Sequence, residues 1–202
     1  MKDAQKWKRM VDGNDRALED LYLSFFDKLY YFGFNFTQDE QIIKDCIQLL
    51  FIEITCYRKK LTEVKYVNAY IFKSFKRLLV KELKKNERFE PLEELGNPYF
   101  ETTASAEKEV ILQEASEELK KAISASIQKL TPKQREAIYL KFTCSLSYLE
   151  MSEYLGIGIE SARVLIARSI QKIRLEIQKH TDLDTNNLIL FYLSTFKGWQ
   201  KN

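Results

Sequence analysis

Apolar residues recur three or four positions apart in three segments of the first half of the chain, residues 18–30, 42–54 and 67–78. This spacing places them on one face of an α-helix. Thr37, with Glu40 three residues later, predicts a capping box before the second segment. We therefore predict a helical N-terminal domain whose third helix carries lysine and arginine on its outer faces.

The second half of the chain also has a helical pattern. Thr131 followed by Pro132 predicts an N-cap and a first-turn proline for a helix over residues 133–142. Residues 147–163 have the layout of a helix-turn-helix: Ser147 and Glu150 at capping spacing, Gly156 at the turn, and Ile157, Ala162 and Ile166 facing the core. A plain αα-hairpin with a glycine turn is the alternative.

The pattern weakens over residues 87–118, where glutamate, two prolines and a glycine gather. We expect an all-α fold of two small helical domains, residues 1–88 and 105–180, joined by an acidic linker over residues 89–104. An apolar C-terminal extension, residues 181–202, follows. It predicts a terminal helix packed on the second domain or, alternatively, a latch that holds the free protein compact.

The net charge of +3 is a sum of large opposing blocks. Residues 58–86 carry 10 basic and 2 acidic side chains, residues 87–118 carry 2 and 10, and residues 119–180 carry 11 and 5. A single charged run is usually a solvated helix face. Two basic blocks in separate domains favour nucleic-acid binding, because lysine and arginine facing phosphates supply much of its affinity. The acidic block is either a soluble spacer or a segment that threads a basic channel.

Residue counts argue against catalytic, metal and membrane functions. The three cysteines are far apart and His180 is the sole histidine, so we expect no catalytic residue, metal site, disulfide framework or cofactor. No apolar run approaches the ~20 residues of a membrane span, and the N-terminus has no signal-peptide core. We expect a cytoplasmic protein without membrane insertion.

Several motifs in order resemble one family. The stretch from Asp45 through Gln48 to Phe51 is similar to the D-x-x-Q-x-x-F of region 2.2 in extracytoplasmic-function (ECF) sigma factors, members of the sigma-70 family. Residues 70–84 resemble regions 2.3 and 2.4, residues 130–137 resemble the L-P-x-x-Q-R-E of region 4.1, and residues 146–174 resemble region 4.2. The resemblance covers roughly residues 10–180.

The resemblance implies a non-enzymatic subunit that directs core RNA polymerase to promoter DNA, assists melting, and is controlled by an anti-sigma factor. It implies three sets of binding residues. The core polymerase would contact Asp45, Gln48, Phe51 and Glu53. The minus-ten element would contact Tyr66, Asn68, Lys73, Lys76, Arg77, Lys81 and Lys84. The minus-thirty-five element would contact Ser147, Glu160, Ser161, Arg163, Val164, Arg168 and Lys172.

Simpler roles stay open for these residues. The polymerase set could be ordinary helix surface, and the aromatic residues Tyr66, Tyr70 and Phe72 could either stack on an unpaired base or belong to the core. Arg77, Ala162 and Leu165 depart from residues common in the family, which puts the promoter sequence in doubt. Two other functions compete: a dimeric helix-turn-helix repressor or activator, and a helical adaptor that binds only protein.

Overall fold

The computed structural model describes residues 2–62, 64–85 and 125–179, which form two compact units treated separately below. Every regular element in these ranges is helical, which confirms the all-α prediction. The predicted linker, the start of the second domain near residue 105 and the C-terminal extension lie outside the described residues. None of the described helices is long and apolar enough to cross a membrane.

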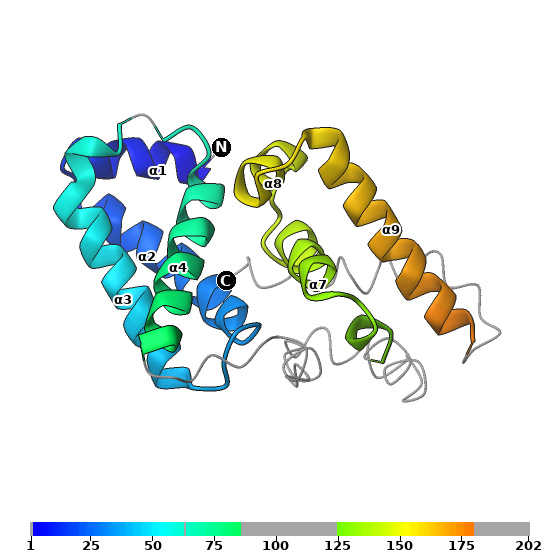
Figure 1. Cartoon of the computed structure of the whole chain (residues 1–202). Coiled ribbons are helices and arrows are strands. Elements are labelled where there is room, and N and C mark those ends of the chain that lie inside the picture. Colours follow the sequence, from blue (N-terminus) through cyan, green and yellow to red (C-terminus); the bar gives the residue numbers. More distant parts are fainter. Residues whose placement is uncertain (1, 63, 86–124, 180–202) are drawn as a thin grey trace, which may run out of the picture. The chain divides into compact units, whose positions relative to one another are not determined.

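Residues 2–62 and 64–85 of the first unit form four α-helices and one short 3-10 helix (Figure 1). They are α1 (Lys2–Val11), α2 (Asp15–Gly33), α3 (Glu40–Tyr57), η1 (Arg58–Lys60) and α4 (Val67–Lys85). Helices α2, α3 and α4 pack together around aromatic side chains, and α1 lies across the end where α3 finishes and α4 starts. Phe32 is fully buried, and its ring meets that of Phe72 edge to face at 5.2 Å between centroids.

The start of α3 differs from the prediction. Asp39, not Thr37, is the N-cap: its side chain accepts hydrogen bonds from the backbone N–H groups of Gln41 and Ile42. The Thr37 hydroxyl oxygen instead accepts from the Asp39 N–H, and Thr37 is buried. The predicted capping box is therefore wrong, because a carboxylate two residues nearer the helix occupies the cap and the threonine stabilises the turn before it.

Helix α1 was not anticipated from the apolar spacing. It is anchored by Trp7 and Met10, both buried. The Trp7 indole N–H donates to the Leu61 carbonyl oxygen at 3.2 Å, and the Trp7 ring meets the Tyr70 ring edge to face at 5.5 Å. Two large anchors one helical turn apart are enough to hold a ten-residue amphipathic helix against the start of α4.

Helices α2 and α3 approach closely at the last residue of α2. A Cβ atom placed on Gly33 would lie 2.7 Å from the Ile43 Cγ2 atom, which is closer than real side chains come. Both residues are buried. Glycine at this crossing lets α2 and α3 pack closely. After the turn over residues 34–39, α3 can therefore run back directly alongside α2.

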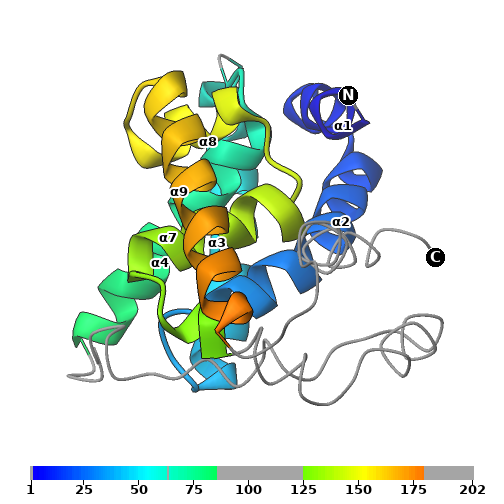
Figure 2. The same cartoon turned by 90° about the vertical axis from the view of Figure 1, so that its right-hand side faces the viewer.

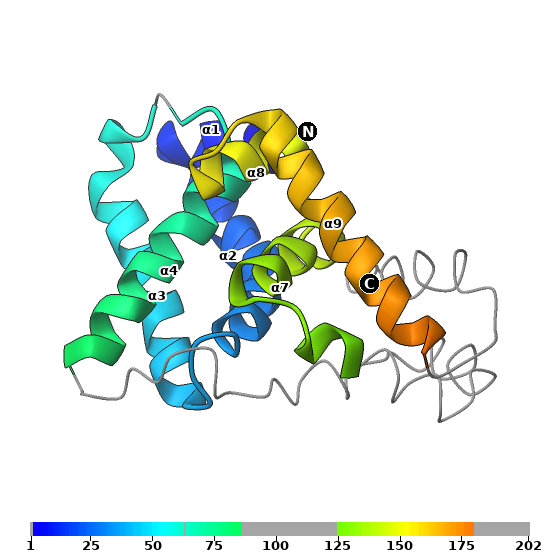
Figure 3. The same ribbon diagram turned by 45° about the vertical axis from the view of Figure 1, so that its right-hand side comes forward.

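The second unit contains α7 (Pro132–Ile138), a π-helical segment η3 (Tyr139–Thr143), α8 (Tyr148–Leu155) and α9 (Ile159–Gln178). Helix α9 is the longest of these, and α7 packs along it (Figures 2 and 3). Thr131 caps α7 and Pro132 occupies its first turn, as predicted. The cap is a full capping box with Gln134, which was not predicted.

The predicted helix over residues 133–142 changes geometry halfway. After Ile138 it widens into the π-helical segment, and Ser145 then adopts a left-handed backbone with φ of 58°. The Leu146 N–H bonds back to the Leu140 carbonyl oxygen at 3.0 Å, which closes the turn, and Leu146 is fully buried. This turn sets where α8 begins.

Candidate nucleic-acid interface

Residues 147–163 form two helices joined by a tight glycine turn (Figure 3). The Ser147 hydroxyl oxygen accepts from the Glu150 N–H at 3.2 Å, and a Glu150 carboxylate oxygen accepts from the Ser147 N–H at 2.8 Å, so the predicted capping box is confirmed. Gly156 has φ of 64°, a left-handed conformation that other residues adopt at a cost. Ala162 and Ile166 are buried as predicted, whereas Ile157 is only half-buried.

The predicted DNA-contacting residues of α9 share one exposed face. Arg163, Val164 and Arg168 lie three, four and eight positions after Glu160, and all four residues are exposed. Ser161 at the edge of this face is exposed too. Lys172 is half-buried one turn further along, and Ser147 is exposed at the start of α8. Arg163 is held loosely, with its Nε 3.5 Å from a Glu160 carboxylate oxygen. A helix face of this kind, about two turns long, can lie in the DNA major groove and contact base edges.

Helix α4 carries a second cationic face. Lys73, Arg77, Lys81 and Lys84 recur at helical spacing and are all exposed, so their charges form one stripe along the helix. Lys76 lies beside this stripe, half-buried, with its Nζ 5.3 Å from the centre of the Phe36 ring. Evenly spaced ammonium and guanidinium groups can follow a phosphate backbone without requiring a base sequence.

Aromatic side chains near this stripe divide into core and surface. Phe72 is fully buried between the Phe25 and Phe32 rings, so it cannot stack on a base and its predicted alternative role is wrong. Tyr70 is half-buried against Trp7. Tyr66 and Asn68 are half-buried at the start of α4 and remain candidates for contact with DNA.

Helix α3 presents a mixed surface to solvent. Asp45 and Gln48 are exposed and Glu53 is half-buried, but Phe51 is buried, with its ring 5.1 Å from that of Tyr22. A direct polymerase contact by Phe51 is therefore wrong, since its side chain packs under the surface that its neighbours form.

Exposed apolar side chains that had escaped the sequence analysis include Leu23 of α2 and Leu49 and Ile52 of α3. Ile52 is 58% exposed and Leu23 is 65% exposed. The signal was present, because each residue is apolar yet lies off the buried stripe of its helix. Large exposed apolar side chains beside polar ones are typical of protein-binding surfaces.

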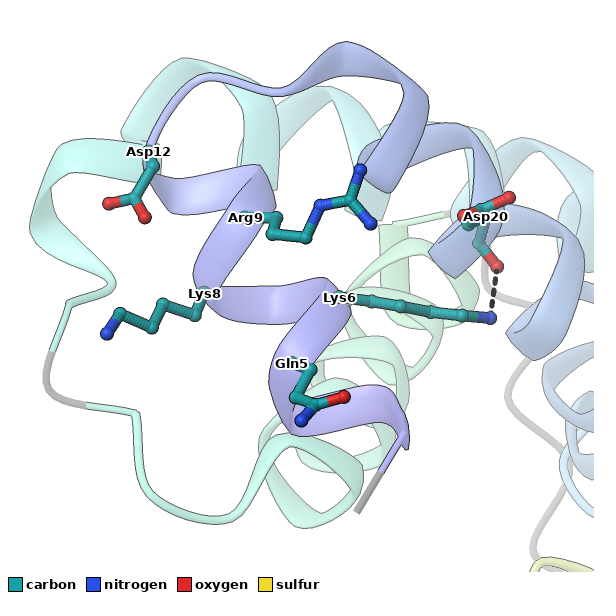
Figure 4. Close-up of a pocket in the computed structure, with 6 residues that line it drawn as sticks. All are labelled: Gln5, Lys6, Lys8, Arg9, Asp12 and Asp20. Atoms are coloured by element: carbon teal, nitrogen blue, oxygen red, sulfur yellow. Dashed lines mark hydrogen bonds between the residues drawn. The ribbon is translucent and has the colours of Figure 1, made fainter.

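A surface pocket lies between α1 and the start of α2 (Figure 4). The Lys6 ammonium reaches across it and donates to the Asp20 carbonyl oxygen at 3.3 Å. Its lining is Gln5, Lys6, Lys8, Arg9, Asp12 and Asp20. Cations and carboxylates are nearly balanced there, so the pocket favours neither anions nor cations, and we assign it no ligand. Among the described residues there is also no cluster of three side chains suited to a metal ion.

Comparison with known proteins decides between the competing functions. A family model described as sigma-70, region 4, matches residues 120–173, which include α7, α8 and most of α9. The RNA polymerase sigma factor SigZ of Bacillus subtilis (strain 168) is 26% identical over 157 residues, 78% of this chain and 85% of that protein. The matched segment is a sigma-70 region 4 domain, and the likeness to an RNA polymerase sigma factor extends over most of the chain.

The fold of the chain is similar to that of a solved structure. The structure of CnrH in complex with the cytosolic domain of CnrY is similar with a TM-score of 0.57 and 15% identity, covering 89% of this chain and 99% of that one. At that identity the likeness concerns the fold alone. The helix-turn-helix lies within the segment that the region 4 model matches.

Proposed function

We propose that this chain is an ECF sigma factor of the sigma-70 family that acts in transcription initiation. Its first unit would bind core RNA polymerase and the minus-ten element, and its second unit the minus-thirty-five element. The observation that carries the proposal is that each unit presents its own exposed cationic helix face, on α4 and on α9. A dimeric repressor needs only one such face per subunit. The chain itself forms and breaks no bond; binding energy is used for promoter choice and strand opening.

The exposed face of α3 is the proposed polymerase surface. Ile52 and Leu49, three positions apart, supply exposed apolar area for burial, and Asp45 and Gln48 supply polar groups at its edge. Fully burying an aliphatic side chain of this size contributes about 1.5–3 kcal/mol before ordering costs. An interface of this kind has an apolar centre and a polar rim.

The α4 stripe would hold the melted or melting minus-ten strand by its phosphates. The face of α9 would lie in the major groove, where Arg163 can donate two hydrogen bonds to a guanine edge and Arg168 contacts phosphate. Protein partners follow from the same assignment: core polymerase and, by analogy with the CnrH complex, an anti-sigma factor that covers these surfaces.

The decisive experiment mixes the purified full chain with core polymerase and genomic DNA fragments and maps transcript starts. We expect co-purification with core, initiation at a limited set of promoters, and weak duplex binding without core. Tight sequence-specific DNA binding by the chain alone, with no association to core, would overturn the proposal and favour the repressor.

Matched variants locate the two surfaces. Ile52→Lys should weaken association with core, whereas Ala4→Lys adds the same charge at an exposed position of α1 and should not. Lys81→Gln should weaken open-complex formation, while Lys8→Gln removes the same charge from α1 and serves as its control. Equal effects within either pair would show that the charge itself, not the proposed surface, matters.

A further inference from the structure

Three elements of the second unit bring their side chains together at one aromatic ring. Tyr148 is the first residue of α8, and two cations lie over its ring: the Lys141 Nζ at 4.3 Å from the centroid and the Arg163 Cζ at 5.3 Å. Lys141 belongs to the π-helical segment and Arg163 to α9. Both distances are within the range where a cation is attracted by the ring quadrupole. We call these three residues the Tyr148 cluster.

The backbone fixes two members of the cluster. The Lys141 ammonium donates to the Leu146 carbonyl oxygen at 3.1 Å, across the left-handed turn at Ser145. Tyr148 follows the Ser147 cap, which is bonded to Glu150 through both its N–H and its hydroxyl. The ring is thus placed by the turn and the cap, independently of α9.

Arg163 is the adaptable member. Its side chain is 57% exposed, and its Nε lies 3.5 Å from a Glu160 carboxylate oxygen that is itself 83% exposed. Exposed ion pairs of this length constrain an arginine little. The Tyr148 ring is therefore the rigid surface against which the guanidinium can be oriented, and an arginine oriented before binding loses less conformational freedom when it meets DNA.

We propose that Tyr148 is a positioning residue for promoter recognition. Its ring, itself fixed beside Lys141, orients Arg163 toward the base edges of the minus-thirty-five element. The ligand is a purine edge in the major groove, with guanine favoured because its two acceptors match the guanidinium fork. This inference rests on the proposed function of α9 and adds a residue outside the recognition helix to the determinants of sequence preference.

The first test examines the free protein, so that it does not depend on promoter activity. In the full chain, the Arg163 side-chain protons should show upfield ring-current shifts by NMR. Tyr148→Leu should abolish these shifts and Tyr148→Phe should retain them. The exposed neighbour Leu149, changed to alanine, is the control and should leave them in place. Unshifted Arg163 protons in the wild-type chain would overturn the inference.

The second test uses holoenzyme and a set of promoters that differ at single positions of the minus-thirty-five element. Tyr148→Leu should reduce the preference for the best over the next-best base about two- to fivefold, the effect expected from one exposed cation–π contact. Tyr148→Phe should keep the preference. In an Arg163→Ala background, Tyr148→Leu should have no further effect on it.

The outcomes separate this inference from the proposed function. If Tyr148→Leu leaves promoter preference unchanged, or lowers it equally in the Arg163→Ala background, the positioning role is wrong while initiation by the wild-type holoenzyme still supports the sigma assignment. If the wild-type chain does not initiate with core, the division of work between the units fails, and the NMR shifts alone still decide whether Tyr148 orients Arg163.

Discussion

Replacing Gly33 with alanine tests how closely α2 packs on α3. The added Cβ would lie 2.7, 2.8 and 3.0 Å from the Cγ2, Cγ1 and Cδ1 atoms of Ile43. All three belong to a fully buried side chain, which cannot retreat without displacing its neighbours. Overpacking of this kind costs about 1–3 kcal/mol, and the helix preference for alanine over glycine returns about 0.5–1 kcal/mol. We expect the free energy of unfolding to fall by about 1 kcal/mol, within a range of about 0–2.5 kcal/mol.

The assay is urea denaturation of the full chain followed by circular dichroism, in a double-mutant cycle with Ile43→Ala. Ile43→Ala removes all three crowded atoms and alone should cost about 2–5 kcal/mol. The double variant should be more stable than additivity predicts by at least about 1 kcal/mol, because the new Cβ then enters the space that Ile43 vacates.

Gly158→Ala is the matched control for this cycle. A Cβ on Gly158 would meet only the Ser161 hydroxyl oxygen, at 3.8 Å, which is ordinary contact. Its effect should therefore add to that of Ile43→Ala. If Gly33→Ala is clearly stabilising, or if its effect adds to that of Ile43→Ala, then the crossing of α2 and α3 is not limited by this contact and the reasoning fails.

Three further predictions concern recognition, ionisation and the C-terminal extension. Arg163→Ala should cost about 1–3 kcal/mol of binding free energy at one position of the minus-thirty-five element and relax the base preference there. Arg168→Ala should weaken binding to all promoters alike and lower the slope of the salt dependence of binding by about one. An unchanged promoter ranking with Arg163→Ala would contradict the base contact. Burial raises the pKa of the Cys46 thiol from 9.0 to about 11. Between these pH values the folded chain keeps a proton that the unfolded chain loses, so the free energy of unfolding should fall as pH rises from 9 to 11. Denaturation at several pH values should show a smaller fall for Cys46→Ala than for Cys56→Ala, which replaces an exposed thiol. Deleting residues 183–202 should raise promoter activity and ease polymerase binding if the extension is a latch, and should lower the melting temperature without gain of activity if it is a structural helix.

Helical spacing predicted the parts of the fold that depend on one buried stripe. It located α2, α3 and α4, and local side-chain chemistry located the starts of α7 and α8, because a cap is decided by residues three positions apart. The same reasoning failed at Thr37, since two neighbouring residues could both cap the helix and only the path of the preceding turn selects Asp39. It missed α1, whose two anchors give too few points for a period.

Binding residues were predictable where binding requires exposure and charge at helical spacing. Most of the predicted cations of α4 and α9 are exposed in the structure, whereas Lys76 and Lys172 are half-buried. The resemblance assigned Phe51 to polymerase contact, and Phe72 was a candidate for stacking on a base. Both side chains are buried, since an aromatic residue in a motif can pack beneath the surface that its neighbours form. The Tyr148 cluster could not be predicted at all: its members come from three elements, and their meeting depends on a turn that no spacing rule describes.

The widened segment after Ile138 has a consequence for how this part of the chain is compared with relatives. Six consecutive residues, 135–140, are buried, which one stripe on a regular α-helix cannot accommodate. A π-turn holds one more residue than an α-turn, so side chains after it are rotated by about 100° relative to a continuous helix. A relative with an uninterrupted α-helix here should align only with a single-residue gap within residues 139–143. Without that gap, every position from Lys141 to the start of α8 would be paired with a residue on the wrong face.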